Sequence, residues 1–197
     1  MEAKLKGITV GVVLTGSHCT IGDVVPQIIR LKQEGAVIYP ILSSSVDETD
    51  NRFYKTDDLK KIIHGITDKP IINSIVSAEP IGPKKLLDIV VVMPATGNTI
   101  AKMANGITDT PALMAVKAHL RNQRPVVIGI SSNDALGSNA RNIGLLINMK
   151  NIYFIPFGQD NPIEKANSMV ARFDQTVDTV IQALQGKQIQ PVIIGTF

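Results

Sequence analysis

The 197 residues are long enough for one domain with a sizeable buried core, and neither a linker nor an internal repeat divides them. Hydrophobic residues make up 44% of the chain but aromatic residues only 4%, which indicates an aliphatic α/β core; the absence of Trp excludes indole stacking on a ligand. The net charge of +3 is modest and the basic residues are scattered, which argues against nucleic-acid binding.

Cys19 is the single cysteine, which excludes an intramolecular disulfide and a cysteine-based metal cluster. The apolar stretch near the N-terminus is too short for a signal peptide, and no run of ~20 apolar residues could span a membrane. A cytoplasmic protein without bound metal is therefore expected.

The first buried strand is predicted at 7–14, followed by a turn, Thr15-Gly16-Ser17-His18, and a helix that Gly35 ends. The turn suits phosphate binding by backbone N–H groups, but it is not GxGxxG, so a dinucleotide fingerprint is not supported. Cys19 stands at the helix start, where a lone cysteine is more often a small core residue than a nucleophile.

A second strand is predicted at 37–42 and ends in three serines, of which Ser43 and Ser45 are candidate phosphate or flavin contacts. A polar loop entry is the alternative. The polar segment 47–54 is expected to be mobile and to cover a ligand. A helix is expected at 57–64, a short third strand at 70–72, and a helical turn at 84–87.

The central strand, 89–93, is entirely apolar, as in a parallel sheet buried on both faces, and such a strand ends at the ligand crevice. The next six residues combine small side chains, two hydroxyls and an amide, and lead into a helix that begins at Asn98 or Thr99 and ends at 105–106. This set suits an anionic or heteroaromatic cofactor, although an ordinary strand–turn–helix joint fits equally well.

Further along the chain, a helix at 111–120 capped by Thr110 precedes a strand at 126–130. Polar residues 131–134 follow, where a substrate would meet the cofactor. The next helix is expected to bury Leu136, Ala140, Ile143 and Ile147 and to leave Arg141 off this stripe, as a carboxylate receptor or a solvated surface residue.

The last predicted elements are a strand at 152–155, a long helix at 162–184, and a tail at 188–197 that adds a strand or packs on a neighbour. Strands that alternate with helices predict a three-layer α/β sandwich with a largely parallel sheet.

The segment PATGNTIAKMANGITDT resembles the PASANT segment of the flavoprotein superfamily, the homo-oligomeric flavin-containing cysteine decarboxylases, in which it contributes to an FMN site at a subunit interface. The resemblance implies a Rossmann-like fold, a homo-oligomer in a multiple of three, and bound FMN. The implied FMN contacts are Thr15, Gly16, Ser17, Ser43, Ser45, Pro94, Ala95, Thr96, Gly97, Asn98 and Thr99.

Two decarboxylase features of that superfamily are missing. Pro80 stands where the catalytic His would align, and only Asn133 remains of the substrate motif PxMNxxMW. A proline side chain cannot act as a base. Decarboxylation of a cysteine is therefore not expected, and Asn133 remains as the catalytic candidate.

Three longer segments, GVVLTGSHCT, EPIGPKKLLDIVVVMPATGNT and SSNDALGSNARNIGLLINMKNIYFIPFGQDNP, narrow the resemblance to one branch of the superfamily. In that branch an unlike partner chain, expected to bring a nicotinamide-nucleotide domain, takes part in oxidising a lysine-pathway intermediate to pyridine-2,6-dicarboxylate during sporulation. The resemblance implies substrate contacts at Ser131, Ser132 and Arg141. The alternatives are an independent FMN-dependent decarboxylase or prenyltransferase-like enzyme, and a non-catalytic stabilising subunit.

Overall fold

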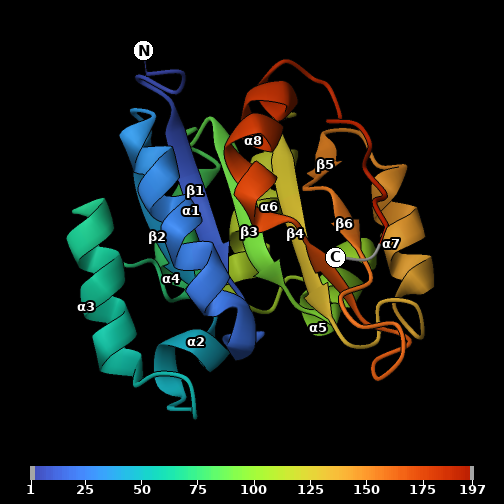
Figure 1. Ribbon diagram of the computed structural model, residues 1–197. Coiled ribbons are helices and arrows are strands. Elements are labelled where there is room, and N and C mark those ends of the chain that lie inside the picture. Colours follow the sequence, from blue (N-terminus) through green and yellow to red (C-terminus); the bar gives the residue numbers. More distant parts are fainter. Residues whose placement is uncertain (1–2, 196–197) are drawn as a thin grey trace.

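The computed structural model, which describes residues 3–195, has a seven-stranded sheet between two layers of helices (Figure 1). The strand order is β2-β1-β3-β4-β7-β6, and β5 also pairs with β4. Among the strands of residues 3–195, β7 pairs antiparallel with β4 and β6, and the other pairs are parallel. The strands are β1 Thr9–Leu14, β2 Val37–Leu42, β3 Ile89–Ala95, β4 Val126–Ser132, β5 Ile152–Phe154, β6 Phe157–Gly158 and β7 Met169–Ala171. The predicted α/β sandwich with a largely parallel sheet is confirmed.

Strands β3 and β4 form the centre of the sheet, and all of their residues are buried. Helices on both faces exclude water from these strands, which explains their continuous apolar sequence. Both strands run two residues further than predicted, so Pro94 and Ala95 end β3, and Ser131 and Ser132 end β4.

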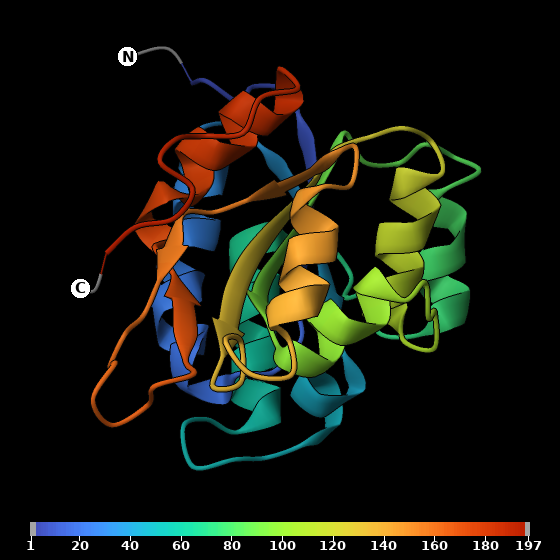
Figure 2. The same cartoon turned by 90° about the vertical axis from the view of Figure 1, so that its right-hand side faces the viewer.

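Two groups of helices cover the sheet (Figures 1 and 2). One face carries α1 Ile21–Gln33 and α8 Thr176–Leu184, and the other carries α5 Gly97–Ala104, α6 Pro111–Leu120 and α7 Ala140–Ile147. Helix α3 Thr56–Thr67 packs against α1 and β2 at the edge of the sheet. The shorter helices are α2 Ser44–Glu48, α4 Ile75–Ala78, η1 His18–Thr20, η2 Glu79–Ile81 and η3 Phe173–Gln175.

The predicted long helix at 162–184 is wrong, since α8 begins only at Thr176. The preceding part of the segment contains β7, whose Val170 pairs with Ser131 of β4. Pairing with an existing strand end satisfies backbone groups that a helix would otherwise satisfy locally. Tertiary contact therefore overrides the local pattern at this place.

The helix after β4 also differs from the prediction, because residues 133–139 form turns and α7 begins at Ala140. Leu136, Ala140 and Ile147 are exposed as a result, and Ile143 alone of the predicted stripe is buried. The turns are held by Asp134, which accepts a hydrogen bond from Asn139 Nδ2 at 2.8 Å.

The segment after β2 is more regular than expected, because residues 44–48 form α2. Asp47 of this helix is buried, lies 2.9 Å from Lys60 Nζ and accepts a hydrogen bond from Asn73 Nδ2 at 3.0 Å. These contacts fix the start of the segment that was predicted to be mobile.

Two further predictions are corrected in detail. Residues 70–72 contribute one isolated bridge, between Ile41 and Ile72, and not a strand, and the predicted helical turn at 84–87 is a turn over 82–85. The tail bridges Phe157 through Ile193, while residues 196–197 of the predicted tail lie outside the described residues. None of the helices within residues 3–195 has the length and apolarity needed to cross a bilayer.

Candidate functional site

The carboxyl ends of β1, β2, β3 and β4 meet at the lower edge of the sheet in Figure 1, near α2 and α5. The hydroxyl of Thr15, just after β1, donates a hydrogen bond to the carbonyl of Pro94 at 2.8 Å and accepts one from the N–H of Thr96 at 3.2 Å. The turns after β1 and β3, which are far apart in the sequence, therefore form one continuous surface.

Gly16 allows the turn after β1 to approach its neighbours closely. Its φ of +114° favours glycine, and a Cβ at this position would lie 3.2 Å from Thr96 Cγ2 and 3.5 Å from Ser45 Oγ. Ser45 Oγ in turn donates to the carbonyl of Thr15 at 3.4 Å and lies 2.9 Å from Ser43 Oγ. The serines after β2 thus join the same surface.

Helix α5 points its N-terminus toward this edge. Thr96 is the cap, because its Oγ1 accepts a hydrogen bond from the N–H of Thr99 at 3.3 Å. Asn98 is exposed, and its side chain has no hydrogen-bond partner among residues 3–195, so it does not cap the helix.

The donor groups at this edge fit an anionic group. The N–H groups of Gly97 and Asn98, in the first turn of α5, donate to no acceptor among residues 3–195, and the positive end of the helix dipole favours negative charge there. The hydroxyl protons of Thr15 and Ser45 are already donated to the carbonyls of Pro94 and Thr15, so these two backbone N–H groups are the donors available to a phosphate monoester. The residues present therefore fit the phosphate of FMN.

Ser131, a predicted substrate contact, is hydrogen-bonded to Ser17, one of the predicted FMN contacts. Ser17 Oγ donates to the carbonyl of Ser131 at 2.7 Å, and Thr20 Oγ1 is hydrogen-bonded to Ser131 Oγ at 3.3 Å. The turn after β1 is consequently fixed to the end of β4, which brings the two predicted sets together.

A chain of polar side chains that was not predicted runs behind the end of β4, and its members Ser132, Asn139 and Asn142 are buried. Ser132 Oγ and Asn139 Nδ2 each donate to the carboxylate of Asp134, Asn142 Nδ2 donates to Asn139 Oδ1 at 2.9 Å, and Asn105 Nδ2 lies 3.5 Å from Asn142 Oδ1. The signal available in the sequence was the density of short polar residues in SSNDALGSNARN.

Gly97 packs directly against this chain. A Cβ on Gly97 would lie 2.5 Å from Asp134 Oδ1, 2.7 Å from Asn139 Nδ2 and 2.8 Å from Ser132 Oγ. The absence of a side chain at Gly97 thus makes room for side chains of the protein itself.

The remaining predicted residues differ in position. Asn133 is exposed and accepts a hydrogen bond from Ser168 Oγ at 3.3 Å. Arg141 is exposed on α7 and is joined to this edge by no hydrogen bond within residues 3–195. Cys19 is exposed, so its interpretation as a core residue is wrong.

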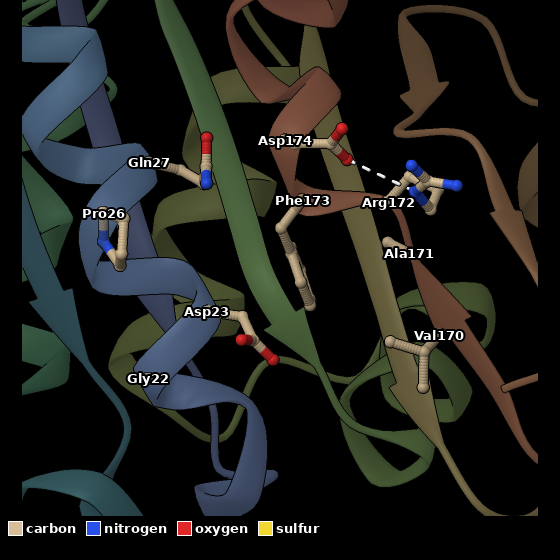
Figure 3. A pocket seen from close by; sticks show the side chains of 9 residues that line it. All are labelled: Gly22, Asp23, Pro26, Gln27, Val170, Ala171, Arg172, Phe173 and Asp174. Atoms are coloured by element: carbon tan, nitrogen blue, oxygen red, sulfur yellow. Dashed lines mark hydrogen bonds and ion pairs between the residues drawn. The ribbon is translucent and has the colours of Figure 1, made fainter. Parts of the chain in front are cut away.

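Two cavities flank the first half of α1. One, of about 330 Å³, lies between α1 and the segment Val170–Asp174, with the ring of Phe173 beside it and Arg172 Nε 3.4 Å from Asp174 Oδ1 (Figure 3). The other, of about 450 Å³, lies between α1, the loop before α3, and α3 itself. Space for a ligand therefore lies on both sides of the first half of α1, and the second cavity also reaches His18 of the turn after β1.

A family model described as Flavoprotein matches residues 1–185. The B subunit of dipicolinate synthase from Bacillus subtilis (strain 168) is 49% identical over 195 residues, which cover 99% of this chain and 98% of the relative. The crystal structure of the B subunit of dipicolinate synthase from Bacillus halodurans C matches with a TM-score of 0.91 at 51% identity, over 98% of this chain and 99% of that one. The crystal structure of Burkholderia xenovorans DmrB in complex with FMN has a TM-score of 0.65 at 17% identity, over 90% and 96% of the two chains, and shows a shared fold alone.

Proposed function

The chain belongs to the flavoprotein family, and from this premise we propose that it is the B subunit of a dipicolinate synthase. It acts with the A subunit of that enzyme in the two-electron oxidation of a dihydrodipicolinate-level intermediate to pyridine-2,6-dicarboxylate. The observation that carries the proposal is the 49% identity to the Bacillus subtilis B subunit over nearly the full length of both chains.

FMN is the proposed cofactor. Its phosphate would be held by the N–H groups of Gly97 and Asn98, beside the turns that the hydroxyls of Thr15, Ser43 and Ser45 hold together at one edge. Pro94, Ala95, Thr96, Thr99, Gly16 and Ser17 shape the backbone around that position. When bound, FMN would supply a two-electron acceptor.

Asn133 is the proposed catalytic contact with the substrate. At the end of β4, Ser131 and Ser132 are buried, whereas Asn133 is exposed and its amide nitrogen has no partner among residues 3–195. Arg141 is an exposed cation on α7, and its proposed role is to attract a carboxylate of the substrate.

We further propose that residues 1–197 form one domain in a cytoplasmic homo-oligomer whose order is a multiple of three. A shallow apolar cavity of about 270 Å³ between α5 and α6, lined by Met103, Ile107, Leu113 and Val116, supports a contact between like chains beside the cofactor edge. The A subunit would bring a nicotinamide-nucleotide domain.

Dipicolinate formation from the product of dihydrodipicolinate synthase tests the partnership. We expect no appreciable synthesis by this chain alone and restored activity when the A subunit is added, because the decarboxylase groups are missing at Pro80 and around Asn133. Equal rates with and without this chain would reject a catalytic role. Full activity of this chain by itself would instead support an independent flavoenzyme.

Replacing Asn98 by Leu is expected to weaken FMN binding about tenfold, because an exposed amide that can donate and accept is exchanged for a group that can do neither. Titration of FMN followed by its absorbance measures the change, and mass analysis of the released ligand identifies FMN. Asn148→Leu, at the end of α7, is the matched control and should bind like the parent. FMN affinity unchanged in a folded Asn98→Leu variant contradicts the assigned role.

A further inference from the structure

Three polar side chains converge beside the turn after β1. The hydroxyl of Tyr54 lies 2.5 Å from Nδ1 of His18, and Nδ2 of Asn51 lies 3.3 Å from the same nitrogen. The rings of His18 and Tyr54 meet edge to face, with centroids 5.6 Å apart. The loop before α3 is thus attached to η1, which directly follows Gly16 and Ser17.

These contacts fix the tautomer of His18. Asn51 Oδ1 accepts hydrogen bonds from the N–H groups of Phe53 at 2.9 Å and Tyr54 at 3.3 Å, so the amide nitrogen of Asn51 must face the imidazole. An amide nitrogen can only donate, and Nδ1 is therefore the unprotonated, accepting nitrogen. In the neutral ring the proton then sits on Nε2, which has no partner among residues 3–195 and is open to solvent.

His18 and Tyr54 form the polar corner of the cavity of about 450 Å³ between α1 and α3. This volume lies within the range of small-molecule sites, roughly 300–1,000 Å³. The other walls are mostly apolar and are formed by Ile21, Val25, Pro26, Phe53, Leu59 and Ile62. The cavity is therefore lined by a histidine with an unpartnered Nε2–H and by apolar surfaces that suit a flat ring.

A positive charge stands at the rim. The guanidinium carbon of Arg52 lies 4.8 Å from the ring centroid of Phe53, and Arg52 forms no ion pair within residues 3–195. The acidic lining residue, Asp58, is exposed and paired with Lys61 at 3.3 Å, which offsets its charge. The free charge at this cavity is thus positive.

We propose that this cavity binds a planar six-membered ring that carries carboxylates. One carboxylate accepts the Nε2–H of His18, the ring lies against the apolar walls, and a second carboxylate meets Arg52 at the rim. The choice of a pyridine dicarboxylate as ligand rests on the proposed function. The site is separate from Asn133, and it uses the Nε2–H of His18, which has no partner among residues 3–195, whereas Ser131 and Ser132 are buried.

The test is a titration of the full chain with pyridine-2,6-dicarboxylate, followed by ¹H–¹⁵N NMR. We expect the backbone signals of 51–54 and 62 and the His18 Nε2–H signal to shift. His18→Leu should weaken binding about tenfold, and Arg52→Gln should weaken it several-fold and reduce its dependence on salt. His64→Leu, which replaces an exposed histidine on α3, is the matched control and should bind like the parent.

Several results overturn the assignment: shifts confined to Asn133 and Ser168 or to Gly97 and Asn98, no binding by the parent, or unchanged binding by both variants. Arg52 is exposed, so Arg52→Gln decides the question even if His18→Leu does not fold. The measurement needs neither FMN nor the A subunit. Binding at the cavity would therefore stand even if the proposed oxidation failed, and absence of binding there would leave the FMN and partner assays to be judged separately.

Discussion

Lowering the pH from 7 to 4 is expected to remove about 3 kcal/mol of folding stability through His119. This side chain of α6 is 1% exposed, and its Nε2 has no hydrogen-bond partner among residues 3–195. Burial, assisted by the positive charge of Arg124, lowers the pKa of His119 from 6.5 to about 4. The native protein therefore keeps this imidazole neutral.

Stability falls as the pH is lowered because the unfolded chain binds a proton at His119 more readily than the folded chain does. Below pH 6.5 the unfolded chain protonates His119, while the folded chain does so only near pH 4. The contribution of His119 to the free energy of unfolding is thus fully present above pH 6.5, and it is lost progressively as the pH falls to about 4. Urea unfolding at several pH values measures the loss.

The variant His119→Leu should lack this part of the pH dependence, whatever its absolute stability at pH 7. His64→Leu, which removes an exposed histidine, should retain it. If the parent and His119→Leu lose stability in parallel between pH 6.5 and 4, the native His119 is not held neutral and the interpretation is wrong.

Gly97→Ala is expected to destabilise the protein by about 3 kcal/mol, at the upper end of overpacking effects. The new methyl group would lie 2.5–2.8 Å from polar atoms of Ser132, Asp134 and Asn139. These atoms hydrogen bond to one another, so they cannot withdraw without breaking the polar chain that they form. Thermal or urea unfolding measures the cost.

The control is Gly144→Ala in α7, where a Cβ meets no atom within 4 Å. This substitution should be neutral or stabilise the protein by up to about 1 kcal/mol, because alanine favours a helix more than glycine does. Combining Gly97→Ala with Asp134→Ala should cost less than the sum of the single changes, since the carboxylate nearest to the methyl group is removed. A Gly97→Ala variant as stable as the parent would show that Ser132, Asp134 and Asn139 can move away from the methyl group without loss of stability.

Most of the sheet could be predicted from the sequence because its central strands are continuous apolar runs between polar residues. β2 was predicted with its observed bounds, and the capped start of α6 at Pro111 was also correct. The segment 162–184 could not be predicted in this way, because Met169–Ala171 becomes a strand only through pairing with the end of β4. Local sequence does not contain that partner.

The gathering of hydroxyl residues was predictable at the level of strand ends, since residues after parallel strands collect at one edge of the sheet. The bonds of Thr15 to β3 and of Ser17 to β4 show that the edge is assembled as expected. The pairing of His18 with Tyr54 was not predictable, because a loop of no regular pattern brings the phenol to the imidazole. Such contacts depend on tertiary geometry that no spacing rule describes.

The shared edge of β4 bears on how the chain assembles during synthesis. The first half of that edge pairs with β5, but Ser131 and Ser132 pair with β7, which leaves the ribosome much later. Because a protein is made from its N-terminus, the strand ends of β1, β2 and β3 can come together before β7 exists. Pairing with β7 is therefore the last backbone contact that the end of β4 makes at this edge. A truncated chain that lacks residues 169–171 would keep the bonds of Ser17 and Thr20 to Ser131 but leave that strand end unpaired on one side.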